Sequence, residues 1–188
     1  MQQGRIVIIT GSPGTGKTTA ASCVAKASSL NKSVHMHTDD FYHYLSKGAV
    51  PPHLPESNGQ NQVVIEAFLE ATKCFAHNGY DVIVDGIIGP WFIEPWIKAV
   101  QDGYEIHYVI LRASKEKTLE RAVKRSKLDR EANIGLVETM WGQFRQLGDY
   151  ECHVLTTTDL SLEETVAMIM DGLEKRTYLL PCKSDYAE

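Results

Sequence analysis

The sequence predicts an α/β protein in which a five-stranded parallel sheet lies between two layers of helices, a three-layer α/β/α arrangement. Short apolar segments rich in β-branched residues alternate with longer segments in which apolar residues recur at helical spacing. The connections between the expected strands are long enough for the crossovers that parallel pairing requires. The length of 188 residues suits one substantial core, so we expect a single domain over residues 1–188.

The expected elements follow in chain order. Apolar, β-branched runs predict strands at residues 5–10, 33–37, 81–85, 104–112 and 152–157. Helical spacing and helix-forming residues predict helices at residues 17–30, 63–78, 91–100, from 115 onward, 134–147 and 161–175. Ser161 and Glu164 form a capping-box pattern before the last helix, and the chain after Arg176 is expected to be loosely held. Three prolines and a polar run predict an irregular excursion over residues 41–62, and such long loops are usually functional.

Composition and charge exclude several classes of protein. Hydrophobic residues make up 43% of the chain and charged residues 23%, as in ordinary globular domains. The net charge of -5 provides no broad cationic surface, so neither nucleic acid nor a membrane is expected as a partner. No membrane-spanning stretch or signal-peptide pattern is found, which predicts a cytoplasmic protein. The four cysteines are scattered and are expected to be free thiols.

The segment GSPGTGKTT lies between the first expected strand and the first expected helix. It matches G-x-x-x-x-G-K-[ST], in which glycines let backbone N–H groups surround a phosphate at a helix N-terminus. We expect Lys17 to act in catalysis by contacting the β- and γ-phosphates, and the Thr18 hydroxyl to bind Mg²⁺. The expected ATP-binding residues are Gly11, Ser12, Pro13, Gly14, Thr15, Gly16, Lys17, Thr18 and Thr19.

Three acidic residues follow the second and third expected strands, whose carboxyl ends face a nucleotide in a parallel sheet. Asp39 is expected to orient and deprotonate an acceptor hydroxyl, or to hold magnesium through water. Asp40 is expected to bind the acceptor or to cap a helix, and the two roles could be exchanged. Asp85 is expected to bind Mg²⁺. Gly86 comes directly after it, where motor-type ATPases commonly have a carboxylate, and this favours transfer to an acceptor other than water.

Two arginines and several aromatic residues complete the expected site. Arg121 and Arg125 share one helix face, where both could stabilise the transferring phosphoryl group as a lid at residues 125–135 closes. A solvent-exposed basic helix is the alternative. The expected acceptor-binding residues, besides Asp40, are Phe41, Tyr44 and Trp91. Trp96 is expected in the core. His35 and His37 alternate on a strand, where they form either one wall of a pocket or part of a ligand set.

Four segments resemble the small P-loop kinases of the nucleoside-monophosphate-kinase-like group, such as gluconate, shikimate and nicotinamide riboside kinases and chloramphenicol phosphotransferase. They are GSPGTGKTT, DDFYHYL, VIVDG and VILRASKEKTLERAVKR. The resemblance implies a P-loop NTPase fold with strand order 2-3-1-4-5 and a short lid. It also implies Asp39 as base or metal-water ligand, Arg121 and Arg125 on the phosphates, and adenine near residues 156–159. The segment IIGPWFIEPW departs from shikimate and adenylate kinases, so the acceptor does not carry over.

These expectations combine into one function. The sequence predicts an ATP-dependent phosphotransferase, a kinase that uses Mg²⁺ and transfers the γ-phosphoryl group of ATP to a hydroxyl or phosphate of a small metabolite. An ATP-binding regulatory protein and a plain ATPase are the alternatives, and both predict no stimulation by an acceptor. The identity of the acceptor and the oligomeric state stay open.

Overall fold

The computed structural model describes the backbone of residues 4–125 and 130–181, and the side chains of residues 4–122 and 134–181. Its strands are β1 (Arg5–Thr10), β2 (Ser33–His37), β3 (Asp81–Asp85), β4 (Glu105–Arg112) and β5 (Val154–Thr156). Its α-helices are α1 (Lys17–Lys26), α2 (Thr38–His43), α3 (Asn58–His77), α4 (Glu94–Gln101), α5 (Lys115–Arg125), α6 (Arg130–Gln143) and α7 (Leu162–Glu174). Short 3-10 helices cover Pro55–Ser57, Pro90–Phe92 and Gly148–His153.

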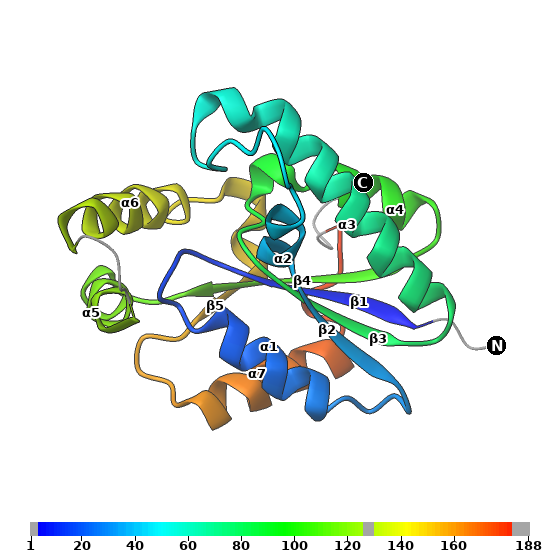
Figure 1. Ribbon diagram of the computed structural model, residues 1–188. Coiled ribbons are helices and arrows are strands. Elements are labelled where there is room, and N and C mark those ends of the chain that lie inside the picture. Colours follow the sequence, from blue (N-terminus) through cyan, green and yellow to red (C-terminus); the bar gives the residue numbers. More distant parts are fainter. Residues whose placement is uncertain (1–3, 126–129, 182–188) are drawn as a thin grey trace.

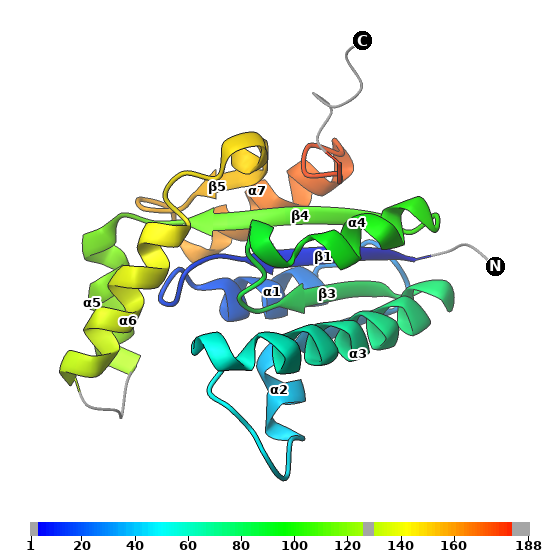
Figure 2. The ribbon, with the colours of Figure 1, turned by 90° about the horizontal axis from the view of Figure 1, so that it is seen from above.

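The five strands form one sheet in the order β2-β3-β1-β4-β5, and every pair is parallel. The predicted sheet and strand order are therefore confirmed. Helices α1 and α7 cover one face, and α3 and α4 cover the other (Figure 1). Helices α5 and α6 lie beyond the carboxyl ends of β1 and β4, as Figure 2 shows from a second direction. The sheet is thus open at this edge to ligands, between elements that come from both halves of the chain.

Each face of the sheet has its own apolar core, because successive strand residues point to opposite sides. Ile6 and Ile8 of β1 belong to the cluster under α3 and α4, whereas Val7 and Ile9 belong to the cluster under α1 and α7. Trp96 is fully buried in the first cluster, as predicted. No described helix is long and apolar enough to cross a membrane.

Some helix boundaries differ from the predicted ones. The expected helix at 91–100 is split into a 3-10 turn and α4, because Pro95 has no backbone N–H and cannot lie inside a continuous helix. Helix α1 ends at Lys26, four residues early, and the next turn is held by a bond from the Leu30 backbone N–H to Ser28 Oγ. The capping box of Ser161 and Glu164 is confirmed at α7.

The irregular excursion is shorter than predicted, because α2 continues to His43 and α3 begins at Asn58. The remaining strap, residues 44–57, is tied to α3 by side-chain bonds. The Gln60 amide both donates to the Val50 carbonyl and accepts from the Val50 N–H, each over 2.8 Å. Asn61 Nδ2 donates to the Pro52 carbonyl over 2.9 Å. Polar residues that look like loop in the sequence are therefore the first turns of a helix that holds the strap.

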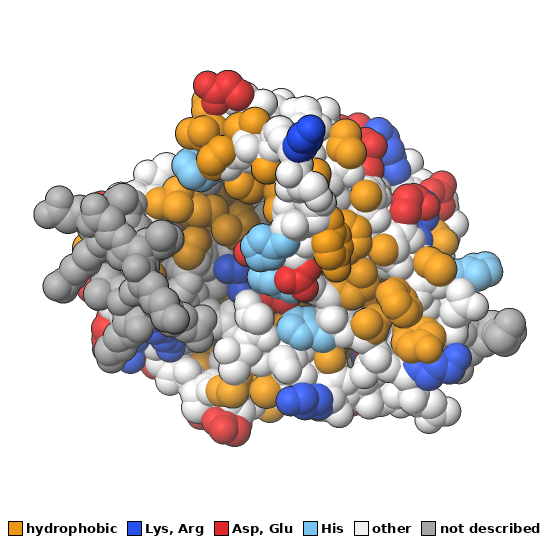
Figure 3. All heavy atoms as spheres, in the orientation of Figure 1, with side chains coloured by type: hydrophobic (Ala, Val, Ile, Leu, Met, Phe, Trp, Pro, Cys, Tyr) orange, Lys and Arg blue, Asp and Glu red, His pale blue; other side chains and the backbone are white. Residues whose placement is uncertain are grey.

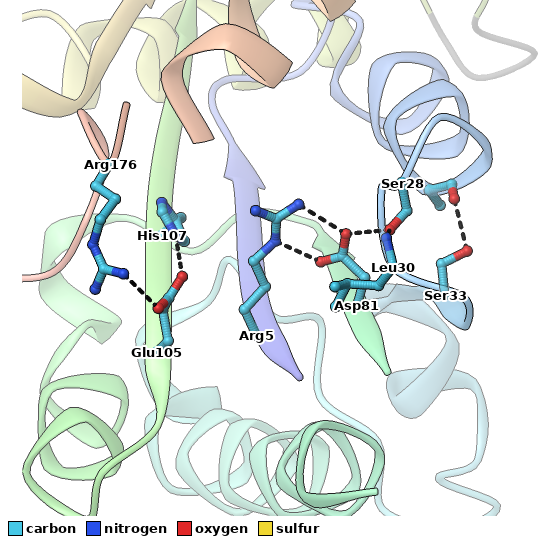
Figure 4. Close-up of polar contacts among 9 residues, drawn as sticks. Arg5, Ser28, Leu30, Ser33, Asp81, Glu105, His107 and Arg176 are labelled. Carbon is cyan, nitrogen blue, oxygen red and sulfur yellow. Dashed lines mark hydrogen bonds and ion pairs between the residues drawn. The ribbon is translucent and has the colours of Figure 1, made fainter. Parts of the chain in front are cut away.

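Polar contacts join the amino ends of the strands, at the edge opposite the glycine loop (Figure 4). Arg5 of β1 makes two bonds to the buried Asp81 of β3, at 2.9 and 3.0 Å, and Ser28 also donates to Asp81. On β4, Glu105 contacts the buried His107 at 2.9 Å and accepts from Arg176 at 2.9 Å. The Arg5–Asp81 pair thus joins β1 to β3, and Glu105 ties β4 to the chain after α7.

The prediction of a loose chain after Arg176 is wrong for the next four residues. The backbone N–H of Tyr108 donates to Tyr178, and that of Leu180 donates to Ile106, at 2.7 and 2.9 Å. Because β5 pairs only with the last residues of β4, this segment covers the β4 edge that β5 leaves open.

A second correction concerns the cysteines. Cys23 and Cys74 are free, as predicted. Cys152 takes part in a disulfide, so the prediction of a free thiol is wrong for this residue.

Candidate active site

The glycine loop joins β1 to α1 at the carboxyl edge of the sheet. Gly14 and Gly16 have φ angles of 85° and 89°, in the left-handed region that favours glycine. A Cβ on Gly14 would lie 2.4 Å from the Thr118 carbonyl oxygen, so α5 packs directly against the loop. No side chain of the described residues caps the N-terminus of α1, so its first N–H groups can face an anion.

Two side chains cross the inside of the loop. Thr15 Oγ1 donates to the Ser12 carbonyl oxygen over 2.9 Å, and Lys17 Nζ donates to the same oxygen over 3.4 Å. Ser12 and Thr15 are buried. The loop is therefore held in its shape by bonds from its own side chains. The contacts of its nine residues with ATP stay a prediction.

The two expected magnesium ligands lie together. Thr18 Oγ1 donates to Asp85 Oδ2 over 2.6 Å, and Asp85 is fully buried at the end of β3. A hydroxyl and a carboxylate are oxygen donors of the kind that Mg²⁺ prefers, with further positions left for nucleotide phosphates. The donor set fits the ion. Among the described residues, no group of three or more His, Cys, Asp or Glu side chains is arranged to hold a metal.

Two histidines of β2 contact the same carboxylate. His35 Nε2 lies 2.6 Å from Asp85 Oδ1, and His37 Nδ1 lies 3.1 Å from Oδ2. The other ring nitrogen of His37 lies 3.2 Å from Asp39 Oδ2. His37 therefore bridges the expected base and the expected metal ligand. The alternation of His35 and His37 was a visible signal for one wall of a pocket, but their contact with Asp85 depends on the pairing of β2 with β3.

These contacts change the protonation of all three groups in the bridge. Asp39 and then Asp85 raise the pKa of His37 to about 10. The contact with His37 lowers the pKa of Asp39 below its usual range. Burial alone would raise the pKa of Asp85, but contacts with His35, His37 and Thr18 outweigh burial and hold it well below the usual range. At neutral pH the site thus contains two carboxylates with an imidazolium between them.

The acidic and aromatic residues after β2 take different positions. The Asp39 side chain is 59% exposed, although its carboxylate is held by His37. Asp40 is exposed inside α2 and does not cap it, because the N-cap position belongs to His37, so the capping alternative is wrong. Phe41 packs edge-on against Phe68 of α3 with ring centroids 4.9 Å apart, which places it against the core. Tyr44 is 72% exposed.

The loop after β3 carries the fourth expected acceptor residue. Trp91 is 46% exposed and packs edge-on against Phe144, with ring centroids 5.4 Å apart. Its ring lies over Gly89, where a Cβ would come within 2.4 Å of the indole. Figure 3 shows this face of the molecule as hollowed, with Lys or Arg, Asp or Glu and His side chains inside the hollow and hydrophobic side chains along one side.

The cationic side of the site is described only in part. Arg121 lies one turn beyond Thr118, the residue of α5 that touches the glycine loop, and is half-buried. Arg125 is the last residue of α5, and its side chain lies outside the described residues. The same is true of residues 126–129 of the expected lid. The roles of both arginines stay predictions.

The loop expected near adenine does lie at the start of α5. The backbone N–H of Ser114 donates to Thr158 Oγ1 over 2.9 Å, and that of Thr157 donates to the Arg112 carbonyl over 2.8 Å. Residues 156–159 and the N-terminus of α5 are therefore neighbours beside the glycine loop. Their contact with a base stays a prediction.

Comparison with known proteins agrees with this geometry. The model of a family described as AAA domain, AAA_18, matches residues 7–140. No curated protein matches the chain significantly.

Several solved structures are similar over nearly the whole chain. An APS kinase of Mycobacterium tuberculosis, solved with AMPPNP and APS, has 21% identity and a TM-score of 0.69, covering 93% of this chain and 99% of its own. A gluconokinase of Sinorhizobium meliloti has 16% identity and a TM-score of 0.63, over 94% and 95% of the two chains. A tunicamycin resistance protein of Deinococcus radiodurans has 19% identity and a TM-score of 0.63, over 95% and 99%. At these identities the likeness shows a shared fold.

Proposed function

The chain belongs to the AAA_18 family of AAA domains, and we propose that it is an ATP-dependent small-molecule kinase. It has the kinase-like P-loop fold of the nucleoside-monophosphate-kinase-like enzymes. The observation that carries the proposal is the bridge from Asp39 through His37 to Asp85. It holds an exposed carboxylate beside the glycine loop. A kinase needs a carboxylate at this point, directed at the acceptor.

The donor side is assigned to the glycine loop and α1. Backbone N–H groups and the helix dipole bind the phosphates, and Lys17 contacts the β- and γ-phosphates. Thr18 and Asp85 would hold Mg²⁺, which supplies positive charge to the phosphate oxygens when bound. Arg121 and Arg125 stabilise charge on the transferring group.

Asp39 is assigned to the acceptor. It accepts a hydrogen bond from the acceptor hydroxyl and takes its proton as the new bond to the γ-phosphorus forms. The bond from that phosphorus to the β–γ bridging oxygen breaks, ADP leaves, and the proton later passes to solvent. His37 keeps the Asp39 carboxylate in place throughout.

The residue after Asp85 supports a kinase over a plain ATPase. A Cβ on Gly86 would lie 1.8 Å from Thr38 Oγ1, so the start of α2 fills the space that a side chain would need. A glutamate that activates water could not replace Gly86 unless α2 moved. Kinases are also among the solved structures similar to this chain.

The test is ADP release from Mg-ATP with pooled acceptors: sugars and sugar acids, ribonucleosides, nucleoside monophosphates and hydroxylated antibiotics, each against a blank without acceptor. We expect one pool to stimulate release, and Asp39→Ala to abolish the stimulation while ATP binding is retained. Hydrolysis that no acceptor stimulates would identify an ATPase instead. Tight ATP binding without turnover in any pool would favour a regulatory protein.

A further inference from the structure

The acceptor side of the site is built from two segments, which we call the acceptor wall: residues 38–63 and residues 86–93. They contain α2, the strap, the first turns of α3 and the loop after β3. Both follow strands at the carboxyl edge, and they touch where Gly86 packs on Thr38. In Figure 1 they lie on the other side of the glycine loop from α5, the helix that contains Arg121 and Arg125, the arginines proposed to bind the phosphates.

The charges of the acceptor wall are one-sided. It contains three carboxylates and no arginine, and its one lysine, Lys47, and its two histidines, His43 and His53, are exposed. The carboxylates are Asp39, Asp40 and Glu56. The two ring nitrogens of the nearby His37 already face Asp39 and Asp85, at 3.2 and 3.1 Å. Proteins most often bind a phosphate, sulfate or carboxylate with cationic side chains, above all arginine. The wall would instead repel such a group.

The wall also exposes apolar side chains out of proportion to its length. The described residues include eight exposed large hydrophobic side chains, and four of them belong to the wall. They are Tyr44, Leu54, Val63 and Trp91. Large exposed apolar side chains on segments that follow the carboxyl ends of the strands indicate a binding surface.

Trp91 is the best-fixed member of this group. Its ring is supported below by Gly89 and at its edge by Phe144, yet 46% of the residue is exposed. A supported aromatic ring loses little conformational freedom when a ligand stacks on it. It therefore offers a rigid flat surface to a ring or a hydrocarbon face.

We propose that the phosphoryl acceptor is an uncharged hydroxyl compound with an apolar ring or hydrocarbon face, which packs on Trp91 while its hydroxyl meets Asp39. This inference rests on the proposed kinase function and narrows its substrate. It excludes acceptors that carry phosphate, sulfate or carboxylate, including the sugar acids and nucleotides among the tested pools.

The experiment uses pairs of compounds that differ only by an anionic group: ribonucleosides and their 5′-monophosphates, sugars and sugar acids, hydroxylated aromatic compounds and their carboxylated forms. Two readouts are taken on the full chain. One is ADP release from Mg-ATP, and the other is quenching of tryptophan fluorescence with AMPPNP bound. We expect an uncharged member to be preferred in kcat/KM by about tenfold or more.

Variants test whether the acceptor binds to the acceptor wall. Trp91→Ala should raise KM about tenfold with a smaller change in kcat, and Trp91→Phe should restore most of the affinity. Met168→Ala removes an exposed apolar side chain from α7, away from the wall, and should change neither value. Tyr44→Arg adds a cation to the wall and should improve the anionic members.

The outcomes separate the inference from the proposed function. Preference for an anionic member would overturn the inference and leave the kinase intact. Quenching by an uncharged member without any ADP release would support the inferred class of ligand and overturn the proposed kinase activity. If no member binds or stimulates release, both fail.

Discussion

His37 of β2 is the register partner of Asp85 of β3, and its Nδ1 lies 3.1 Å from the Asp85 carboxylate. Parallel pairing of the two strands thus brings an imidazole to the expected metal ligand. The other nitrogen of the same ring lies 3.2 Å from Asp39, in the first turn of α2. Both acids are exposed in α2, and the contact with His37 distinguishes Asp39 from its neighbour Asp40. The two acids were interchangeable in the sequence and are different in the structure.

The first prediction concerns these two acids. Asp39→Asn should lower kcat about 100-fold or more, which is the range of general-base catalysis. The reason is that no carboxylate would then take the proton from the substrate hydroxyl. Asp40→Asn should change kcat much less and serves as the matched control. Steady-state kinetics with the acceptor that the pooled assay identifies, together with ATP binding to each variant, measure both effects. A larger loss in Asp40→Asn would exchange the two assignments.

The second prediction concerns the contact of Gly86 with Thr38. Gly86→Ala should destabilise the fold by about 2 kcal/mol, because the new methyl group overlaps the Thr38 side chain. Gly59→Ala is the control. It lies in α3 with nothing within 4 Å of the added Cβ, and should stabilise by up to about 1 kcal/mol. Urea unfolding monitored by circular dichroism gives both values, and equal stability of the two variants would contradict the assigned contact.

A third prediction tests the buried end of β3. Asp81→Asn should cost about 3 kcal/mol, because Arg5 loses its charged partner in a largely buried pair. Glu94→Gln breaks an exposed pair with Lys98 and should cost less than about 1 kcal/mol. Unfolding free energies of the wild type and both variants decide the point. Similar costs for the two would mean that the Arg5 pair contributes no more than a surface pair.

The fourth prediction is a dependence of stability on pH. Burial would raise the pKa of Glu105, but His107 and Arg176 outweigh burial and lower it, while burial lowers the pKa of His107. Both shifts mean that the unfolded chain binds more protons than the folded one in acid, so stability falls as pH falls. The Glu105 contribution is present above its unfolded pKa and is lost as pH drops through its lower folded value.

His107→Asn removes the buried imidazole and its effect on Glu105, so this variant should lose less stability than the wild type between pH 7 and pH 4. Glu163→Gln, an exposed change on α7, should keep the wild-type dependence. Urea midpoints of the three proteins at both pH values are the measurement. An unchanged pH dependence in His107→Asn would remove the pair of His107 and Glu105 from the explanation.

Much of the fold could be predicted because its signals are local. The strand at 81–85 is a continuous apolar run, and the last helix has a capping box, so each was found within a residue of its position. The excursion was placed less well. Gln60 and Asn61 look like loop residues, but they form helix because their side chains bond the backbone of the strap. The chain after Arg176 looked loose because its partner, β4, is about 70 residues away in sequence, and only loop closure brings the two together.

The sequence by itself determined the glycine loop, the strand and helix pattern and the chemical types of the site residues, because these depend on spacing along the chain. Only the tertiary structure decided which of those residues meet. It placed Thr18 and two histidines on the buried Asp85, separated Asp39 from Asp40 and packed the backbone of α5 against Gly14. These contacts join strands and helices that are distant in the chain, and the register of a parallel sheet, which no local pattern specifies, sets them.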